Sequence, residues 1–314
     1  MNAAILAAGL GTRLRPLTHQ RPKALLPVLN QPLLGVLLRQ LQAAGFTRVA
    51  VNTHHLAATV QEYLASRDWG LEVVISHEPE ILGTGGGLRG LGERLGPEPF
   101  LAINADTLTD LNLAAVFQMH QEDNLATLVL HWRRPYNSVW IDETGRVVSV
   151  GEPPDRPFRP PLAYTGVQMV SPGMLARLGT RGYADLVEAW REALAAGEII
   201  GSILATGHFW QDLGTPAAYL ETHRRLLAGE APRLAPFLPP VADPFLGQGA
   251  LLEDGAVCEG GVCLGQEVRV GAGARLKNTV VWEQARISPR VVLEDCIVGA
   301  GVEVRTSARG ELLV

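Results

Sequence analysis

The first candidate ligand-binding residues lie near the N-terminus, in a glycine-rich stretch that follows an apolar run. Gly9 and Gly11 allow a sharp turn and a close approach of the backbone to a ligand. Successive amides in such a turn can point at phosphate oxygens. Leu14 replaces the third glycine of a dinucleotide fingerprint, and no P-loop Gly-Lys-Ser/Thr is present. The loop indicates nucleotide binding through Leu6, Ala8, Gly9, Gly11, Thr12 and Arg13.

A lysine follows in a stiff segment, because Lys23 lies between Pro22 and Pro27. The chain has 27 basic residues, and only Lys23 and Lys277 among them are lysines. A generic surface charge in this sequence is therefore an arginine, which disfavours a solvated surface role for Lys23. A compact ammonium can bridge crowded phosphate oxygens where a planar guanidinium fits poorly. We therefore predict that Lys23 binds phosphate.

Two aspartates stand at positions suited to ligand binding. Asp106 follows the buried run 100–104, and ligands of open α/β sheets bind at the carboxyl ends of strands. Asp212 precedes a turn in which Thr215 can cap the next helix and Pro216 can open it. The capping task is therefore taken by Thr215, and Asp212 is available for another one.

A second glycine cluster, residues 82–88, precedes an expected helix. It reads either as a flexible loop or as a wall over the nucleobase, with Gly83, Thr84 and Gly85 in contact with the nucleotide. The adjacent His54 and His55 could line a sugar pocket. Neighbours at a strand end point in opposite directions, so these two histidines do not form one metal site.

Short apolar runs alternate with helical patterns through residues 1–228, which predicts an α/β domain. Its sheet should be Rossmann-like, mostly parallel and covered by helices on both faces. The expected strands are 3–8, 48–52, 72–76, 100–104, 168–170 and 199–206, and the expected helices are 32–44, 56–66, 113–124 and 184–196.

The composition changes at residue 229, where a proline-rich stretch predicts a linker over 229–245. Small or aliphatic residues then recur six apart, with two one-residue slips. This period matches the hexapeptide repeat of a small left-handed parallel β-helix over 246–314, rather than a generic antiparallel domain. The repeated positions are Leu252, Cys258, Leu264, Val270, Leu276, Val281, Ile287, Leu293, Val298 and Val304.

Composition narrows the classes of partner. The net charge is −5 without a basic block, so we expect neither nucleic acid nor a membrane surface as a partner. No apolar run reaches the roughly 18 residues of a membrane span. The apolar start reads as a buried strand, because a signal peptide would have a basic leader. Cys258, Cys263 and Cys296 form no disulfide or zinc pattern, which fits a reducing cytoplasm.

The two N-terminal motifs, read together as Leu-Ala-Ala-Gly-x-Gly-Thr-Arg-Leu-x-Pro-Leu-Thr and Arg-Pro-Lys-x-Leu-Leu-Pro-Val, closely resemble those of the sugar-1-phosphate nucleotidyltransferases. The resemblance covers nearly the whole chain, including the β-helix tail that many members carry. It implies that Asp106 and Asp212 bind Mg²⁺, that Arg13 holds the leaving phosphates, and that Lys23 draws the reacting phosphates together. The partners would be a nucleoside triphosphate and a sugar 1-phosphate.

The sugar half of the site departs from the family pattern. Gly166 matches a glycine that lets the sugar approach the backbone, and Glu152 a glutamate that binds sugar hydroxyls. The family often has a lysine for the sugar phosphate where this chain has Pro153; Arg156 or Arg159 could replace its charge. A second departure is Ala105, where the family has glycine.

The function expected from the resemblance is transfer of a nucleoside monophosphate to a sugar 1-phosphate, with GTP and mannose 1-phosphate as the leading pair. A uridylyltransferase and a catalytically weakened regulatory paralogue stay open as alternatives. Added acyl transfer is disfavoured because no histidine follows His223. A dehydrogenase is disfavoured by Leu14 and by the missing acidic residue after a second strand. The tail would then serve oligomerisation or cover the catalytic domain, and we expect a homo-oligomer.

Overall fold

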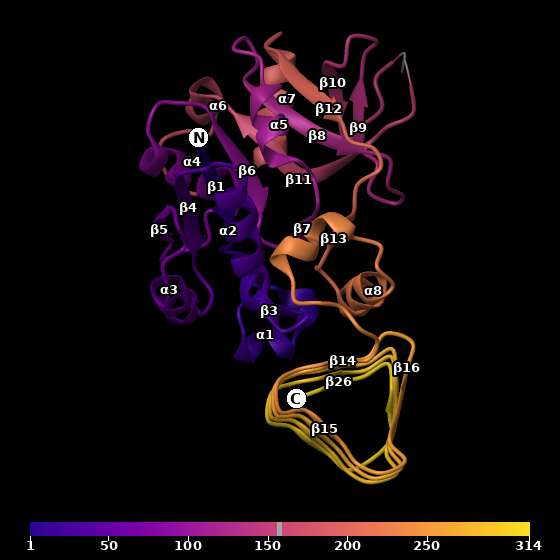
Figure 1. Cartoon of the computed structure of the whole chain (residues 1–314). Helices are drawn as coiled ribbons and strands as arrows, with labels where there is room; N and C mark the ends of the chain where they lie inside the picture. Colours follow the sequence, from indigo (N-terminus) through magenta and orange to yellow (C-terminus); the bar gives the residue numbers. More distant parts are fainter. Residues whose placement is uncertain (156–158) are drawn as a thin grey trace. The chain divides into compact units, whose positions relative to one another are not determined.

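The computed structural model describes residues 1–155 and 159–314. They form two compact units, each of which is made of three separate stretches of the chain (Figure 1). The first unit comprises Met1–Gly9, Leu37–Thr107 and Leu111–His208, and the second comprises Leu10–Val36, Leu108–Asp110 and Phe209–Val314. The second unit therefore holds most of the N-terminal motif together with the predicted β-helix, although these lie at opposite ends of the sequence.

The first unit is built on a seven-stranded sheet of order β12-β8-β11-β6-β1-β4-β5. Strand β11 is antiparallel to both of its neighbours, and the other pairs are parallel, so the predicted mostly parallel sheet is confirmed. The strands are β1 (Asn2–Leu6), β4 (Arg48–Thr53), β5 (Glu72–His77), β6 (Phe100–Asn104), β8 (Ala126–His131), β11 (Ala163–Val170) and β12 (Ile200–Leu204); β9 (Val139–Ile141) and β10 (Val147–Val150) form a separate pair.

Both faces of this sheet are buried, as the apolar runs predict. On one face, Ala4 and Ala102 pack in a core with Leu88 of α4 and Trp190 of α7. On the other face Ile5 is equally inaccessible to solvent. Small residues on the first face let the helices approach the strands closely. The helices are α2 (Leu33–Ala43), α3 (Ala57–Ala65), α4 (Gly83–Leu95), α5 (Leu113–Gln118), α6 (Pro172–Arg177) and α7 (Leu186–Ala195).

Several predicted elements have different bounds in the structure. Helix α5 ends at Gln118, because Met119 caps it and the chain then turns, so the predicted helix to residue 124 is too long. The glycine cluster is not a loop before a helix but the first turn of α4 itself. Strands β8, β9 and β10 were not expected from the sequence.

An apolar core joins the three chain segments of the second unit, and a separate one fills the interior of the β-helix. Leu14 and Leu26 of the N-terminal segment, Tyr219 of α8 and Trp282 of the β-helix all belong to the first of these cores. The proline-rich stretch contributes Leu234, which is fully buried. The elements before the β-helix are η1 (Thr12–Leu14), α1 (Leu17–Gln20), η2 (Lys23–Leu25), β2 (Pro27–Val28), β3 (Gln31–Pro32), β7 (Thr107–Thr109), β13 (Trp210–Asp212), α8 (Pro216–Leu227) and η3 (Pro232–Phe237).

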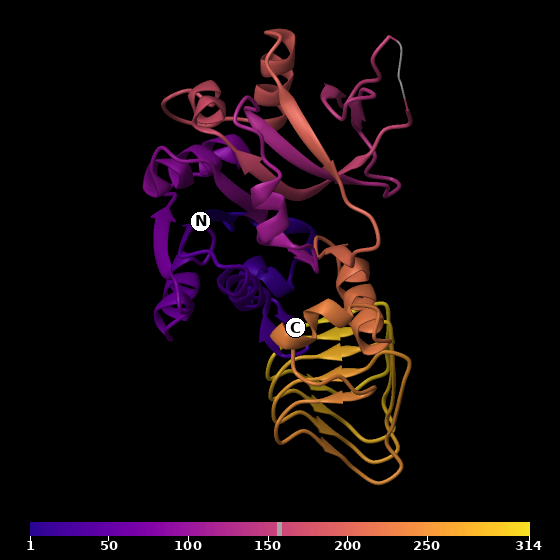
Figure 2. The same ribbon diagram turned by 45° about the horizontal axis from the view of Figure 1, so that its top comes forward.

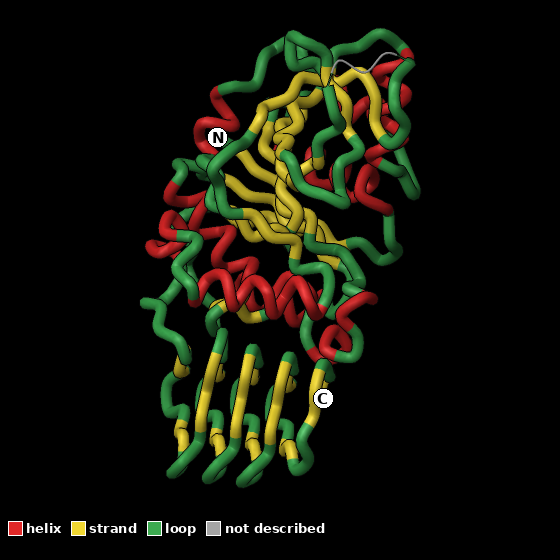
Figure 3. Tube along the Cα trace, turned by 90° about the vertical axis from the view of Figure 1, so that its right-hand side faces the viewer, coloured by secondary structure: helices red, strands yellow, loops and turns green. Residues whose placement is uncertain are grey.

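The tail is a triangular stack of parallel strands, which confirms the predicted β-helix (Figures 1, 2 and 3). Its sheets have the orders β14-β17-β20-β23-β26, β15-β18-β21-β24 and β16-β19-β22-β25. Leu264 pairs with Val281 and Val281 with Val298, so the one-residue slips fall at the same corner of successive coils. The strands are β14 (Phe245–Leu246), β15 (Leu251–Leu252), β16 (Val257–Glu259), β17 (Cys263–Leu264), β18 (Arg269–Val270), β19 (Arg275–Lys277), β20 (Val280–Val281), β21 (Arg286–Ile287), β22 (Val292–Glu294), β23 (Ile297–Val298), β24 (Glu303–Val304), β25 (Ala308–Arg309) and β26 (Leu312–Leu313).

The core of the second unit contains a buried histidine, His223, whose protonation is disfavoured in the folded protein. His223 has no exposed surface; its Nδ1–H donates to the Tyr219 carbonyl at 2.9 Å, and its Nε2 accepts from the Leu29 amide at 3.4 Å. Burial lowers the pKa of His223 to about 4 from its usual 6.5. The neutral ring is therefore the form that the folded unit holds.

We expect the stability of the protein to fall as the pH drops from about 6.5 towards 4. In this window the unfolded chain binds a proton that folded His223 does not, which costs up to about 3 kcal/mol at pH 4. Urea unfolding at a series of pH values measures the slope. The His223→Gln variant should have a shallower slope than the wild type, and equal slopes would contradict the assignment.

Candidate active site

The first half of the N-terminal loop is fixed at the carboxyl edge of the sheet. The amide of Ala7 donates to Oδ1 of Asn52 at the end of β4, at 2.5 Å. The carbonyl of Leu6 accepts from the amide of Ala105 at 3.0 Å. Asp106, which is half-buried, follows directly. Within the first unit, the structure therefore brings the start of the predicted nucleotide loop beside the predicted metal-binding aspartate.

Sequence reasoning missed a buried polar link in this region. Nδ2 of Asn52 donates to Oε1 of Glu78 at 2.6 Å, and Oε2 of Glu78 accepts from the Leu82 amide at 3.3 Å. Asn52 and Glu78 are both nearly inaccessible to solvent. Gly87 makes room for these side chains, because a Cβ on residue 87 would lie 2.6 Å from Nδ2 of Asn52. The link joins the N-terminal loop to the second glycine segment, and no motif or period in the sequence indicates it.

The second glycine segment packs against the chain before α7. The amide of Gly85 donates to the carbonyl of Ala184 at 2.9 Å, and the ring of Tyr183 lies over Gly83. A ligand contact at Gly85 would therefore use its Cα or carbonyl rather than its N–H. Gly83 and Thr84 begin the helix, where amides lack intrahelical partners. His54 donates from Nδ1 to the Glu78 carbonyl at 2.9 Å, which fixes its ring.

The second half of the N-terminal loop lies in the other unit and turns at Gly11. Gly11 has φ +62°, and its carbonyl accepts from the Thr18 hydroxyl at 2.9 Å and from the Leu14 amide at 3.0 Å. A Cβ on Gly11 would lie 2.8 Å from Cγ2 of Thr18 and 3.3 Å from Cβ of Lys23. Gly11 is therefore the point where the loop meets the Lys23 segment.

We expect Gly11→Ala to destabilise the protein by roughly 1–3 kcal/mol. Alanine is strained at the positive φ of this position, and its methyl group would crowd Thr18. Gly9→Ala is the matched variant, since a Cβ there meets nothing within 4 Å. Thermal unfolding should separate the two, with a lower midpoint for Gly11→Ala alone. Gly9→Ala should instead weaken nucleotide binding at unchanged stability, and equal midpoints for both variants would argue against this packing.

Three of the four predicted catalytic residues meet in the second unit. The carboxylate of Asp212 lies 3.9 Å from Nη2 of Arg13 and 4.0 Å from Nζ of Lys23. The side chain of Lys23 is 13% exposed, that of Asp212 24% and that of Arg13 59%. Thr215 caps α8 by accepting from the Ala218 amide at 3.2 Å, as predicted. One carboxylate between two cations is suited to a polyanionic ligand that brings a divalent cation.

The donor set suits Mg²⁺ more than a softer metal. The residues described in the structure contain no cluster of three or more His, Cys, Asp or Glu side chains with metal-ligand spacing. Mg²⁺ needs no such cluster, because one or two carboxylates with substrate phosphates and water complete its shell. Asp212, which lies beside the two cationic side chains of Arg13 and Lys23, fits that pattern, and Asp106 is the second carboxylate that the sequence predicts.

The residues predicted to bind the sugar, Gly166 and Glu152, lie in the first unit. Gly166, with φ +81°, sits in an irregular stretch of β11 where a Cβ would lie 2.7 Å from Oγ1 of Thr107 and 3.1 Å from Nδ2 of Asn104. Gly166 thus lies next to residues that flank Asp106. Glu152 is exposed in the turn after β10. Of the two arginines proposed to replace the family lysine, Arg159 is half-buried and Arg156 lies outside the described residues.

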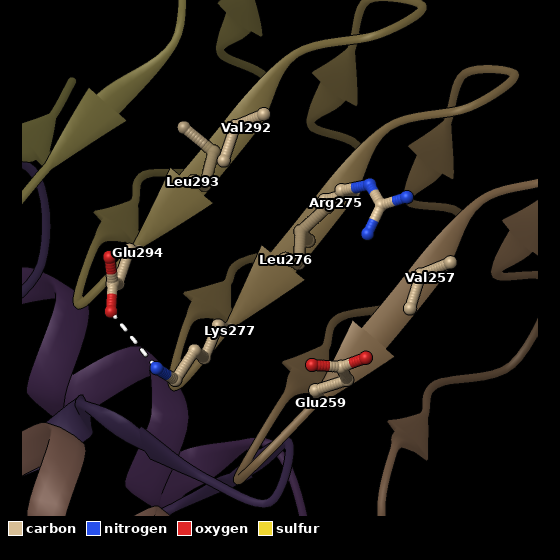
Figure 4. Close-up of a pocket in the computed structure, with 8 residues that line it drawn as sticks. All are labelled: Val257, Glu259, Arg275, Leu276, Lys277, Val292, Leu293 and Glu294. Atoms are coloured by element: carbon tan, nitrogen blue, oxygen red, sulfur yellow. Dashed lines mark hydrogen bonds and ion pairs between the residues drawn. The ribbon is translucent and has the colours of Figure 1, made fainter.

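The other lysine contrasts with Lys23. Lys277 lies on the outer face of β19 in a shallow groove, and Figure 4 shows its ammonium directed at Glu294, 3.1 Å away. Its side chain is 61% exposed. Lys277 thus belongs to an ordinary surface ion pair, whereas Lys23 is enclosed beside Asp212.

The three cysteines are free thiols. Cys263 and Cys296 are buried, and burial raises the pKa of Cys258 to about 11.

Comparison with known proteins identifies the family of this chain. Residues 2–229 match the family described as Nucleotidyl transferase. A mannose-1-phosphate guanylyltransferase of Mycobacterium tuberculosis is 28% identical over 94% of this chain and 83% of its own length. An N-acetylmuramate alpha-1-phosphate uridylyltransferase of Neisseria meningitidis is 34% identical over 68% of this chain and 94% of its own length. A glucose-1-phosphate thymidylyltransferase of Streptomyces griseus is 26% identical over 97% and 87%.

Among solved structures, HddC from Yersinia pseudotuberculosis, complexed with GMP-PN, has the same fold over 72% of this chain and 99% of its own. The TM-score is 0.61 at 21% identity. The chain therefore belongs to the nucleotidyl transferase family, as a sugar-1-phosphate nucleotidyltransferase. Among the described residues, no helix has both the length and the apolar character to cross a membrane.

Proposed function

We propose that this chain transfers guanylyl from GTP to mannose 1-phosphate, with Mg²⁺ as cofactor, giving GDP-mannose and pyrophosphate. The observation that carries the reaction type is the placement of Asp212 between Arg13 and Lys23. The leading substrate pair is supported by the guanylyltransferase of M. tuberculosis, which matches along almost the whole chain, tail included.

A second pair has its own support. The uridylyltransferase of N. meningitidis is 34% identical to this chain over 226 residues, whereas the guanylyltransferase of M. tuberculosis is 28% identical. UTP with an N-acetylmuramate-type sugar 1-phosphate is therefore the alternative.

We assign recognition of the base to Gly83 and Thr84, which form the nucleobase wall. Leu6, Ala8 and Gly9 bind the nucleoside in the N-terminal loop.

In the proposed reaction a phosphate oxygen of the sugar 1-phosphate attacks the α-phosphorus of the triphosphate. The new O–Pα bond forms as the bond to the β-phosphate bridge breaks, and pyrophosphate leaves. Arg13 binds the β- and γ-phosphates, and Lys23 holds the attacking and α-phosphates together. Bound Mg²⁺, held by Asp106 and Asp212, would neutralise charge on the reacting phosphates. Gly166 and Glu152 bind the sugar.

A matrix of the four nucleoside triphosphates against several sugar 1-phosphates tests the substrate assignment. Pyrophosphate release is measured with Mg²⁺ present, and mass spectrometry identifies the nucleotide sugar. We expect the highest kcat/KM for GTP with mannose 1-phosphate. A preference for UTP with a muramic-type sugar would select the alternative. Nucleotide-sugar binding without any turnover would overturn the proposed activity in favour of a regulatory role.

Two expectations about the setting of the protein are also proposals. We infer a cytoplasmic location, because all three cysteines are free thiols in a fold that needs no disulfide. We also infer a homo-oligomer, as expected from the β-helix tail. Sedimentation of the purified protein tests the second point, and a single monomeric species at micromolar concentration would contradict it.

A further inference from the structure

The segment that carries Lys23 is tied to the β-helix at its N-terminal end. The guanidinium of Arg21 binds both carboxylate oxygens of Glu283, with Nη1 to Oε2 at 3.3 Å and Nη2 to Oε1 closer still. The same guanidinium lies over the ring of Trp282, 4.7 Å from the ring centre. A two-bond Arg–carboxylate pair on an aromatic face fixes orientation as well as distance.

The other end of the segment is tied through α8. The hydroxyl of Tyr219 donates to the carbonyl of Pro27 at 2.5 Å, and Nε1–H of Trp282 donates to that hydroxyl at 3.1 Å. A third contact follows, because the side-chain amide of Asn30 donates to the Leu264 carbonyl at 3.0 Å. Trp282 therefore takes part in holding both ends of the stretch 21–27.

Between these ties the chain has little freedom to move. Pro22 and Pro27 fix their own φ angles. Lys23 begins a short 3₁₀ turn in which the Leu25 amide donates to Pro22 at 2.8 Å and the Leu26 amide to Lys23 at 3.1 Å. The backbone of Lys23 is thus held within a rigid turn. Its ammonium cannot move relative to Asp212 by a backbone shift unless one of the ties breaks.

We propose that the β-helix positions the catalytic lysine, with Glu283 and Trp282 as positioning residues that act through Arg21 and Tyr219. This inference rests on the role proposed above for Lys23, and it gives the tail a function within the catalytic step. A loosened segment would still bind triphosphate through the rest of the loop. It would place the ammonium less accurately in the transition state, so kcat should fall and KM should change little.

The kinetic test uses Glu283→Gln, which keeps the shape of the side chain and removes its charge. Its kcat should fall by roughly tenfold with KM within about twofold of wild type. Arg177 and Glu198 form an ion pair of similar exposure, 2.7 Å apart in the first unit, so Glu198→Gln is the matched control with wild-type kinetics expected. In a Lys23→Ala background, Glu283→Gln should cause no further loss. Additive losses, or a wild-type kcat, would overturn the proposal.

A second readout does not depend on activity. Because the chain has only two lysines, mild acylation followed by peptide mass spectrometry reports Lys23 against exposed Lys277 as an internal reference. Glu283→Gln and Trp282→Phe should raise the labelling of Lys23 relative to Lys277, and Glu198→Gln should not. Unchanged ratios would overturn the positioning role even if the wild type is active. A raised ratio in a protein that turns over no substrate pair would leave the positioning in place and refute the proposed function.

Discussion

Lys23→Arg is expected to lower kcat for nucleotidyl transfer by roughly a hundredfold, although it keeps the positive charge. The side chain of Lys23 is enclosed, and its Cβ lies where the loop turns at Gly11. A guanidinium in this space is too wide to approach two phosphate groups at once, and its fork favours two bonds to one group. We expect Lys23→Ala to lose as much activity as Lys23→Arg.

Lys277→Arg is the matched control, because it makes the same substitution at the only other lysine. Lys277 pairs with Glu294 on an open face of the β-helix, where either cation satisfies the carboxylate. Steady-state kinetics should give wild-type values for this variant. If Lys23→Arg also kept the wild-type kcat, Lys23 would be a simple counter-charge, and the assigned contact with both phosphates would be wrong.

Asp212→Asn is expected to lower kcat by several hundredfold or more. The substitution removes the negative charge between Arg13 and Lys23, so the two cations repel each other, and it removes a hard ligand for Mg²⁺. The Mg²⁺ concentration needed for half-maximal activity should also rise. Asp106→Asn should show the same shift if both carboxylates hold the metal.

The control for this substitution is Asp254→Asn, which changes an exposed aspartate of the β-helix in the same unit. It should leave kcat and the Mg²⁺ dependence unchanged. An Asp212→Asn protein with wild-type kcat would remove Asp212 from the reaction, and a lowered kcat with an unchanged Mg²⁺ dependence would assign it a charge role without metal binding.

Local motifs single out three residues that the structure brings together in the second unit. Arg13, Lys23 and Asp212 could be singled out because each has a distinctive neighbour: a glycine turn, two prolines, or a helix already capped by Thr215. The β-helix was predictable down to its slips, since every coil must present an aliphatic residue to the interior at each side.

Contacts between distant segments could not be predicted in this way. Arg21 and Glu283 are 262 residues apart, and the link from Asn52 to Glu78 joins two strand ends through polar side chains that no period reveals. The glycine cluster was expected before a helix because glycine disfavours helices. Packing against the Ala184 backbone outweighs that preference, since a side chain at Gly85 would have no room.

The most direct test of the proposed function measures both products in one reaction. Wild-type protein is incubated with GTP, mannose 1-phosphate and Mg²⁺, and pyrophosphate and nucleotide sugar are quantified together with each substrate omitted in turn. We predict equimolar pyrophosphate and GDP-mannose, formed only when both substrates are present and nearly lost in Asp212→Asn. Pyrophosphate released from GTP without the sugar phosphate, or no nucleotide sugar from any pair in the substrate matrix, would contradict it.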